Sequence, residues 1–155
     1  MSFSPEFERK VGDIIREYPN REAILLPLLY MIQSERGFLS KEDELYAAEK
    51  AGVSPAWIRG VVTFYTMFQG KEIGKYLIQV CTTLSCFLRG SDSILEHIKQ
   101  RLGIDVGGTT PDKKFTLVTV ECLGSCGTAP VMQINDDYYE DLDIEKVDEI
   151  LNSLP

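Results

Sequence analysis

The first part of the chain places its apolar side chains three and four residues apart, which is the period of amphipathic helices. A first helix is predicted after Ser4, a favourable cap, with Pro5 in its first turn. Its apolar face consists of Phe7, Val11, Ile14, Ile15 and Tyr18. A second helix ends at Gly37, and Pro27 within it predicts a kink or a break near Leu26. Its apolar face consists of Ile24, Leu25, Leu28, Leu29 and Ile32.

Two further helices are predicted in the same part of the chain. Ser40 and Asp43 have the spacing of a capping box, which opens a helix that Gly52 ends. Ser54, followed by a proline, opens another helix, whose apolar positions are Trp57, Ile58, Val61 and Val62. We therefore predict an N-terminal helical domain over residues 1–71.

The pattern changes after residue 71, where short apolar runs typical of strands alternate with helical segments. Strands are predicted at about 75–81 and 114–121, with a helix at about 91–102 between them. A hairpin follows over 131–139, and a final helix comes last. This order, β-α-β-β-α, is that of a thioredoxin-like domain, in which the first two strands are parallel and the last two antiparallel. The sequence thus predicts an α/β fold, with a thioredoxin-like domain over residues 72–155 preceded by the helical bundle.

The charge of the chain argues against several partners. Over 155 residues the net charge is −8 and the pI is near 4.7, so little is available to neutralise the phosphates of nucleic acid or anionic lipid. No run approaches the ~20 apolar residues of a membrane span, and the first residues lack the features of a secretory signal. We therefore expect no nucleic-acid binding and no direct membrane insertion. The expected location is cytoplasmic, or the cytoplasmic side of a membrane-bound complex.

The four cysteines form two close pairs, Cys81-x4-Cys86 and Cys122-x3-Cys126. Each pair follows a predicted strand, in a loop from which we expect the sulfurs to point away from the hydrophobic core. In a reducing compartment, such pairs more often bind metal or carry out redox chemistry than form structural disulfides. The cysteines are therefore the candidate functional residues.

Four thiolates suit either zinc or an iron–sulfur cluster. Zinc knuckles and thioredoxin-type dithiols both use a C-x2-C spacing, which neither pair has. A Rieske centre requires two histidines, and His97 is the single histidine of the chain. An all-cysteine [2Fe-2S] cluster fits best, while a structural zinc site and four unrelated buried thiols stay open as alternatives. We expect nearby amides and hydroxyls to donate to the sulfurs, from Thr82, Thr83, Ser85, Gly124, Ser125 and Gly127.

Three other features lead to structural expectations. The segment 64–68 is dense in aromatic and apolar residues, which is more typical of a core than of a binding patch. His97 lies on a polar helical face and is expected to be solvated. Because a thioredoxin-like topology commonly has a cis proline beside its redox centre, a cis bond is predicted between Ala129 and Pro130.

At this point the sequence resembles a known family, the small [2Fe-2S] subunit of the NADH-oxidising module of respiratory complex I (NADH:quinone oxidoreductase). The resemblance rests on GVVTFYTMF at 60–68, on the first cysteine loop VCTTLSC at 80–86, and on the second, ECLGSCGTAP at 121–130, which continues as VMQIN. It extends over essentially the whole chain.

The resemblance implies that Cys81, Cys86, Cys122 and Cys126 are the four cluster ligands. It also implies an electron-transfer subunit of NADH:quinone oxidoreductase, whose helical part docks onto a larger partner that binds FMN and NADH. Hydride transfer would then be the partner's reaction, and this chain has no Rossmann glycine pattern of its own. Two alternatives stay open. One is the equivalent subunit of an NAD-linked hydrogenase or formate dehydrogenase, and the other is a free-standing thioredoxin-like ferredoxin.

Overall fold

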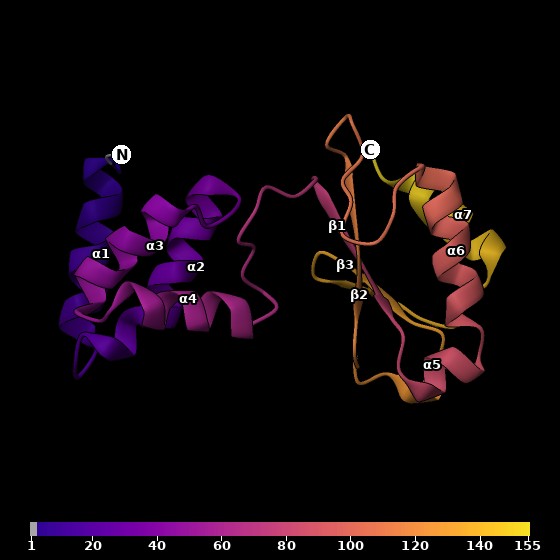
Figure 1. Cartoon of the computed structure of the whole chain (residues 1–155), viewed down its shortest axis with the longest axis horizontal. Coiled ribbons are helices and arrows are strands. Elements are labelled where there is room, and N and C mark those ends of the chain that lie inside the picture. Colours follow the sequence, from indigo (N-terminus) through magenta and orange to yellow (C-terminus); the bar gives the residue numbers. More distant parts are fainter. Residues whose placement is uncertain (1–2) are drawn as a thin grey trace. The chain divides into compact units, whose positions relative to one another are not determined.

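In the computed structural model, which describes residues 3–155, the chain forms two compact units, one up to Glu72 and one from Ile73 onward (Figure 1). The first unit is helical. Its elements are α1 (Pro5–Glu17), the short 3₁₀ turn η1 (Glu22–Ile24), α2 (Leu25–Arg36), α3 (Lys41–Ala51) and α4 (Pro55–Phe64). The predicted apolar faces meet in one core, whose fully buried members include Val11, Ile24, Leu28, Leu29, Ile32, Leu39 and Ile58. The predicted helical bundle is therefore confirmed.

Serine caps fix where the helices of the first unit begin. The Ser4 hydroxyl accepts the Phe7 N–H at 3.1 Å, and Ser54 caps α4 in the same way. Ser40 and Asp43 form the predicted capping box, in which each side chain accepts the other residue's N–H, at 3.2 and 3.0 Å. Each cap gives a partner to N–H groups that have none inside the helix.

Pro27 marks a break in the second predicted helix rather than a kink. The chain makes the η1 turn first, and α2 then begins at Leu25, so that Pro27 lies within its first turn. The N–H that proline lacks would have no partner in the helix at that position, and Pro27 is therefore tolerated there. Tyr18 also differs from the expected pattern, because α1 ends at Glu17 and the Tyr18 side chain is exposed.

The prediction that segment 64–68 belongs to the core is wrong for most of the segment. α4 ends at Phe64, whose side chain is 76% exposed, and Tyr65 and Met67 are exposed as well. Phe68, 5% exposed, turns back into the core, where its ring centroid lies 5.3 Å from that of Tyr30. The helical period no longer applies beyond Phe64, and Phe64, Tyr65 and Met67 form a surface that we call the 64–67 patch.

The second unit is an α/β domain. Its elements are β1 (Tyr76–Cys81), α5 (Leu84–Leu88), α6 (Ser91–Leu102), β2 (Phe115–Val120), the 3₁₀ turn η2 (Cys126–Thr128), β3 (Met132–Ile134), β4 (Asp137–Tyr139) and α7 (Ile144–Ser153). The predicted β-α-β-β-α order is confirmed, with α5 and η2 as short additions in the two cysteine segments.

The four strands of this unit form one sheet with the order β2-β1-β3-β4. β1 and β2 are parallel and in register, from Tyr76 opposite Phe115 to Cys81 opposite Val120. β3 pairs in the antiparallel sense with both β1 and β4, as predicted for the last two strands. Because β1 and β2 run in the same direction, they end at the same edge of the sheet, and each leads there into a cysteine pair.

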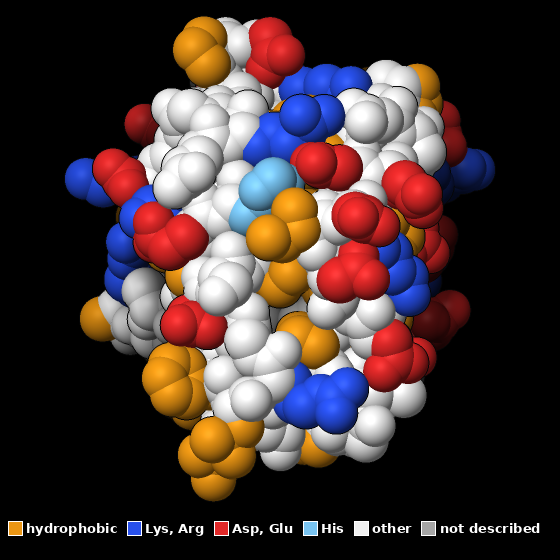
Figure 2. All heavy atoms as spheres, turned by 90° about the vertical axis from the view of Figure 1, so that its right-hand side faces the viewer, with side chains coloured by type: hydrophobic (Ala, Val, Ile, Leu, Met, Phe, Trp, Pro, Cys, Tyr) orange, Lys and Arg blue, Asp and Glu red, His pale blue; other side chains and the backbone are white. Residues whose placement is uncertain are grey.

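α6 and α7 pack on one face of the sheet (Figure 1). Their buried residues Ile94, Ile98, Val147, Ile150 and Leu151 share a core with Ile78, Val80, Leu117 and Met132 from the strands. The prediction that His97 is solvated is wrong, since its Nε2 atom lies 2.9 Å from Oδ1 of Asp148 and links the two helices. Figure 2 shows this side of the domain, where acidic and basic side chains are interspersed. None of the helices formed by residues 3–155 combines the length and the apolar character that a bilayer crossing requires.

Candidate metal centre

All four cysteines lie beside the edge at which β1 and β2 end. Cys81 is the last residue of β1, and Cys86 lies on α5, which follows directly. Cys122 comes two residues after β2, and Cys126 begins the η2 turn. The cysteines are free thiols. The parallel strands thus bring together two segments that are far apart in the sequence.

The first pair is buried, which corrects the expectation that both loops turn their sulfurs away from apolar surroundings. Cys81 and Cys86 are each 2% exposed and form a small apolar cluster with Ala129 and Val131, against which Leu123 packs. The cause is α5, which the sequence did not predict. This five-residue helix begins after Thr83 and turns Cys86 back under the sheet edge while its neighbours remain exposed.

The second pair is exposed, and its sulfurs are close together. The Sγ atoms of Cys122 and Cys126 are 4.0 Å apart. Two thiolates on one tetrahedral metal, each at about 2.3 Å, are separated by roughly 3.8 Å. The N–H of Gly124 donates to the Cys122 sulfur at 3.4 Å, and Gly124 has a φ of 79°, which glycine adopts without strain. This loop is therefore shaped to present both sulfurs to one ion.

Hydrogen bonds join the two cysteine segments. The Cys81 thiol donates to the carbonyl of Glu121 at 3.0 Å, and the N–H of Thr82 donates to the carbonyl of Val120 at 3.1 Å. The N–H of Cys81 donates to the carbonyl of Val131 at 3.1 Å. The first cysteine is thus bonded to the chain on both sides of the second pair. The predicted cis bond between Ala129 and Pro130 is confirmed in the same stretch.

The two buried thiols differ in their ease of ionisation. Burial raises the pKa of Cys86 to about 11, with a contribution from the neighbouring Cys81. Burial also opposes ionisation of Cys81, but hydrogen bonds from the side chain and backbone of Thr83 outweigh it and hold the Cys81 pKa below its ordinary value. The Thr83 hydroxyl lies 3.2 Å from the Cys81 sulfur.

The sulfur surroundings predicted from the sequence are found in part. Thr83 and Gly124 contact sulfurs as expected. The Ser125 hydroxyl instead donates to the carboxylate of Glu140, which also accepts from Thr128. Sequence reasoning missed Glu140, and no local signal identifies it, because the contact exists only once the β3–β4 hairpin has returned the chain to the loop.

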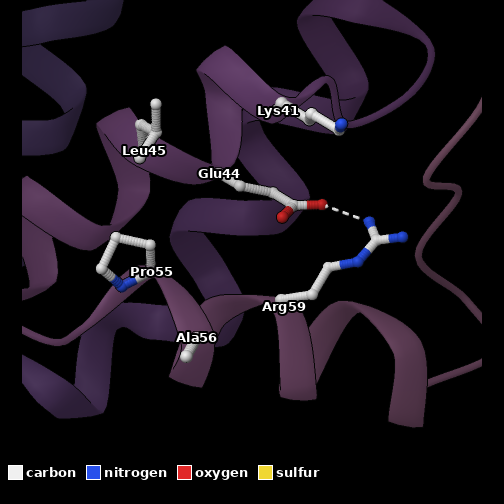
Figure 3. Close-up of a pocket in the computed structure, with 6 residues that line it drawn as sticks. All are labelled: Lys41, Glu44, Leu45, Pro55, Ala56 and Arg59. Atoms are coloured by element: carbon white, nitrogen blue, oxygen red, sulfur yellow. Dashed lines mark hydrogen bonds and ion pairs between the residues drawn. The ribbon is translucent and has the colours of Figure 1, made fainter.

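The donor set fits a two-iron cluster. The thiols form one buried and one exposed pair at a shared sheet edge, and a [2Fe-2S] cluster takes four cysteine thiolates, two on each iron. Within residues 3–155, no three His, Cys, Asp or Glu side chains are gathered as ligands of a single ion would be. In the first unit, a separate cleft of about 560 Å³ between α3 and α4 holds the Glu44–Arg59 ion pair, 2.7 Å long, and no cysteine lines it (Figure 3).

The thioredoxin-like [2Fe-2S] ferredoxin family model matches residues 11–155, which include all four cysteines and the whole sheet. The chain belongs to this family. Its fold is also that of part of a solved NAD+-reducing [NiFe]-hydrogenase, with a TM-score of 0.74 over 86% of this ferredoxin-family chain and 23% of the other, at 22% identity.

Curated relatives cover the ferredoxin-family chain almost completely. It is 46% identical to the mitochondrial NADH dehydrogenase (ubiquinone) flavoprotein 2 of Dictyostelium discoideum, over 99% of this chain but 65% of that protein. It is 44% identical to one of the NADH-quinone oxidoreductase subunits of Rhizobium meliloti, over 88% of this chain and 81% of that one. It is 46% identical to a protein of the same name from Rickettsia conorii, over 92% and 87%.

Proposed function

We propose that this chain is the small electron-transfer subunit of an NADH:quinone oxidoreductase and that it carries one [2Fe-2S] cluster. The observation that carries the proposal is the arrangement of the thiols. Cys122 and Cys126 have their sulfurs 4.0 Å apart, and the buried pair Cys81 and Cys86 lies at the same sheet edge. The names of the relatives support the choice of complex.

In this proposal, Cys81 and Cys86 bind one iron, and Cys122 and Cys126 bind the other. Each loop is short enough to bring its two sulfurs to one iron. Thr83 and Gly124 donate to sulfurs, and the apolar cluster around Cys86 excludes water from the first pair. The bound cluster supplies one-electron chemistry at this edge.

The proposed partner is a larger subunit that binds FMN and NADH and takes up the hydride. Two apolar surfaces support a partner. One is the 64–67 patch, and the other is formed by Leu84, Phe87 and Leu88 of α5, each more than half exposed beside the buried Cys86. Exposed apolar side chains in such groups mark docking surfaces. We accordingly propose residues 1–71 as the docking domain and residues 72–155 as the cluster domain.

Two other readings use the same site. The corresponding subunit of an NAD-linked hydrogenase or formate dehydrogenase would perform the same step, and the shared fold with the NAD+-reducing hydrogenase is compatible with it. A free-standing carrier is less favoured, because a diffusing ferredoxin has no need of a helical unit with the 64–67 patch. The proposed location is the cytoplasmic side of the complex, where a reducing environment keeps thiols available for metal.

Elemental analysis and spectroscopy test the cluster. Anaerobically purified protein should contain about two irons and about two labile sulfides per chain, and after reduction it should show the electron paramagnetic resonance (EPR) signal of one unpaired spin. Zinc without labile sulfide would reject the proposal. Co-expression with the flavin-binding partner, followed by size-exclusion chromatography, tests the partner, and separate elution of the two chains would favour the free-standing carrier.

A further inference from the structure

The second cysteine loop lies at the surface and needs support if it is to keep its two sulfurs at a fixed spacing. Cys122 and Cys126 are both exposed, and η2 is a single turn of three residues. A backbone hydrogen bond from Thr128 N–H to the Ser125 carbonyl, 3.2 Å long, closes this turn. Ligand loops of this kind depend on side chains behind the ligands that hold them in place.

Glu140 contacts the loop on both sides of Cys126. Its Oε1 atom accepts a hydrogen bond from the Thr128 hydroxyl at 2.8 Å and another from the Ser125 hydroxyl. Ser125 comes immediately before Cys126, and Thr128 comes two residues after it. One carboxylate oxygen therefore holds both ends of the turn that carries the candidate ligand.

The protons of this network balance when Glu140 is ionised. The hydroxyl oxygens of Ser125 and Thr128 lie 2.7 Å apart, and each hydroxyl has one proton to donate. A carboxylate accepts and does not donate, so that it can take both protons at once. The hydrogen bonds from Ser125 and Thr128 hold the pKa of Glu140 below its ordinary value.

The segment that carries Glu140 is itself fixed. Glu140 directly follows β4, and its carbonyl accepts from Nζ of Lys146 on α7 at 2.7 Å. The next residue, Asp141, donates its N–H to the carbonyl of Thr128 at 2.7 Å. The carboxylate is thus placed by the sheet, by α7 and by the loop that it contacts.

We propose that Glu140 is a positioning residue for the cluster. Its carboxylate fixes the turn from Ser125 to Thr128, and through it the sulfur of Cys126. Its negative charge beside this loop also disfavours the reduced cluster, because reduction adds a further negative charge to an already anionic centre. This inference rests on the proposed function, since it requires the cluster to be bound.

The positioning role is tested on the full chain with its cluster in place. Glu140→Ala should lose its visible absorbance to an iron chelator several-fold faster than wild type, and its reduced form should give a broadened EPR signal. Removing the two donors together, by Ser125→Ala and Thr128→Val, should have the same effect. Adding Glu140→Ala to that pair should then cause little further loss, because the three side chains act as one unit. Thermal unfolding of the cluster-free variants checks that the domain still folds.

The charge is separated from the positioning by Glu140→Gln. The amide oxygen of glutamine can still accept from both hydroxyls, so the cluster should be retained nearly as in wild type. At the potential where the wild type is half reduced, this variant should be mostly reduced. Asp141→Asn is the matched control, since it removes a neighbouring carboxylate outside the network, and asparagine tolerates the positive φ of 47° at that position. It should change cluster retention little and shift the reduced fraction less.

Two results overturn the inference. The first is a Glu140→Ala chain that keeps its cluster at the wild-type rate and gives the wild-type EPR signal. The second is an Asp141→Asn chain that matches Glu140→Gln in reduced fraction, which would remove the specific charge effect. These failures differ from a failure of the proposed function, in which the wild-type chain itself would contain no iron–sulfur cluster.

Discussion

The N–H of Cys81 donates to the carbonyl of Val131 at 3.1 Å. This hydrogen bond joins the last residue of β1 to the residue that follows Pro130, beyond the second cysteine loop. The bond continues the antiparallel ladder in which Val80 pairs with Met132. The buried cysteine pair is therefore built into the sheet, whereas the exposed pair is supported by loop contacts. The two pairs should respond differently to substitution.

Serine should replace a cysteine more easily in the exposed pair than in the buried pair. In Cys126→Ser the new oxygen lies at the surface, and we expect a retained cluster with a lowered potential, because a harder ligand favours ferric iron. In Cys86→Ser the shorter oxygen would carry charge inside an apolar cluster, which is costly, and most of the iron should be lost. Iron content after gel filtration measures the difference. Equal retention in the two variants would contradict the assigned environments.

The second unit should hold a cluster without the first. A chain of residues 73–155 contains the sheet, both cysteine segments and a core of its own. We expect it to bind iron and sulfide in wild-type amounts, with an unchanged visible spectrum, and to lose binding to the flavin-binding partner. Chemical analysis and a pull-down with that partner are the measurements. Full affinity of the shortened chain for the partner would assign docking to the second unit.

Two phenylalanines of one segment provide a matched test of the 64–67 patch. Phe64 is 76% exposed and Phe68 is 5% exposed. Phe64→Ala should change the free energy of unfolding by less than about 0.5 kcal/mol, because it removes surface contacts. Phe68→Ala should cost about 3–5 kcal/mol, because it leaves a cavity. Urea unfolding gives both values.

If the 64–67 patch binds the partner, Phe64→Ala should also weaken that complex while leaving the isolated chain stable. Titration calorimetry with the flavin-binding partner checks this. Unchanged affinity in the Phe64→Ala variant would show that the patch is not part of the interface.

Glu8 should make part of the stability of the first unit depend on pH. Its carboxylate accepts from Lys50 Nζ at 2.9 Å and from the Tyr46 hydroxyl at 3.0 Å, and the bond from Lys50 is the main cause of its lowered pKa. A lowered folded-state pKa gives stability that is present above the unfolded value, near 4.3, and is lost as the pH falls through the folded value.

The Glu8 side chain is 39% exposed, so solvent screening limits the effect to roughly 0.5 kcal/mol. Glu8→Gln should therefore be less stable than wild type at pH 7, and the difference should shrink toward pH 3. Urea unfolding of both proteins across this range measures it. A constant difference over the whole range would show that the charge of Glu8 is not involved.

Local rules predicted most of the elements, because short-range chemistry decides them. The Ser40–Asp43 capping box and the break at Pro27 depend on residues a few positions apart, and the sequence contains all of them. The β-α-β-β-α order followed from the change in apolar period. The four cysteines were recognised for the same reason, since their spacing is local.

Features that depend on the assembled fold were not predictable. α5 has five residues, too few to show a helical period, and so the burial of Cys86 was missed. The contact of Glu140 with Ser125 requires the hairpin to be in place. The exposure of Phe64 was misjudged because composition does not reveal on which side of a helix end a side chain will lie.

The parallel register of β1 and β2 separates the two ends of the sheet into a constant side and an adjustable side. Both cysteine pairs follow the end where Cys81 pairs with Val120, and one residue inserted in either strand would turn every later side chain to the opposite face. The connection over 103–111 rejoins the sheet at the other end, ahead of Phe115. Chain length there can vary without moving a sulfur. This connection is therefore where we expect homologues to differ in length, and where a label or affinity tag can be inserted with the cluster intact.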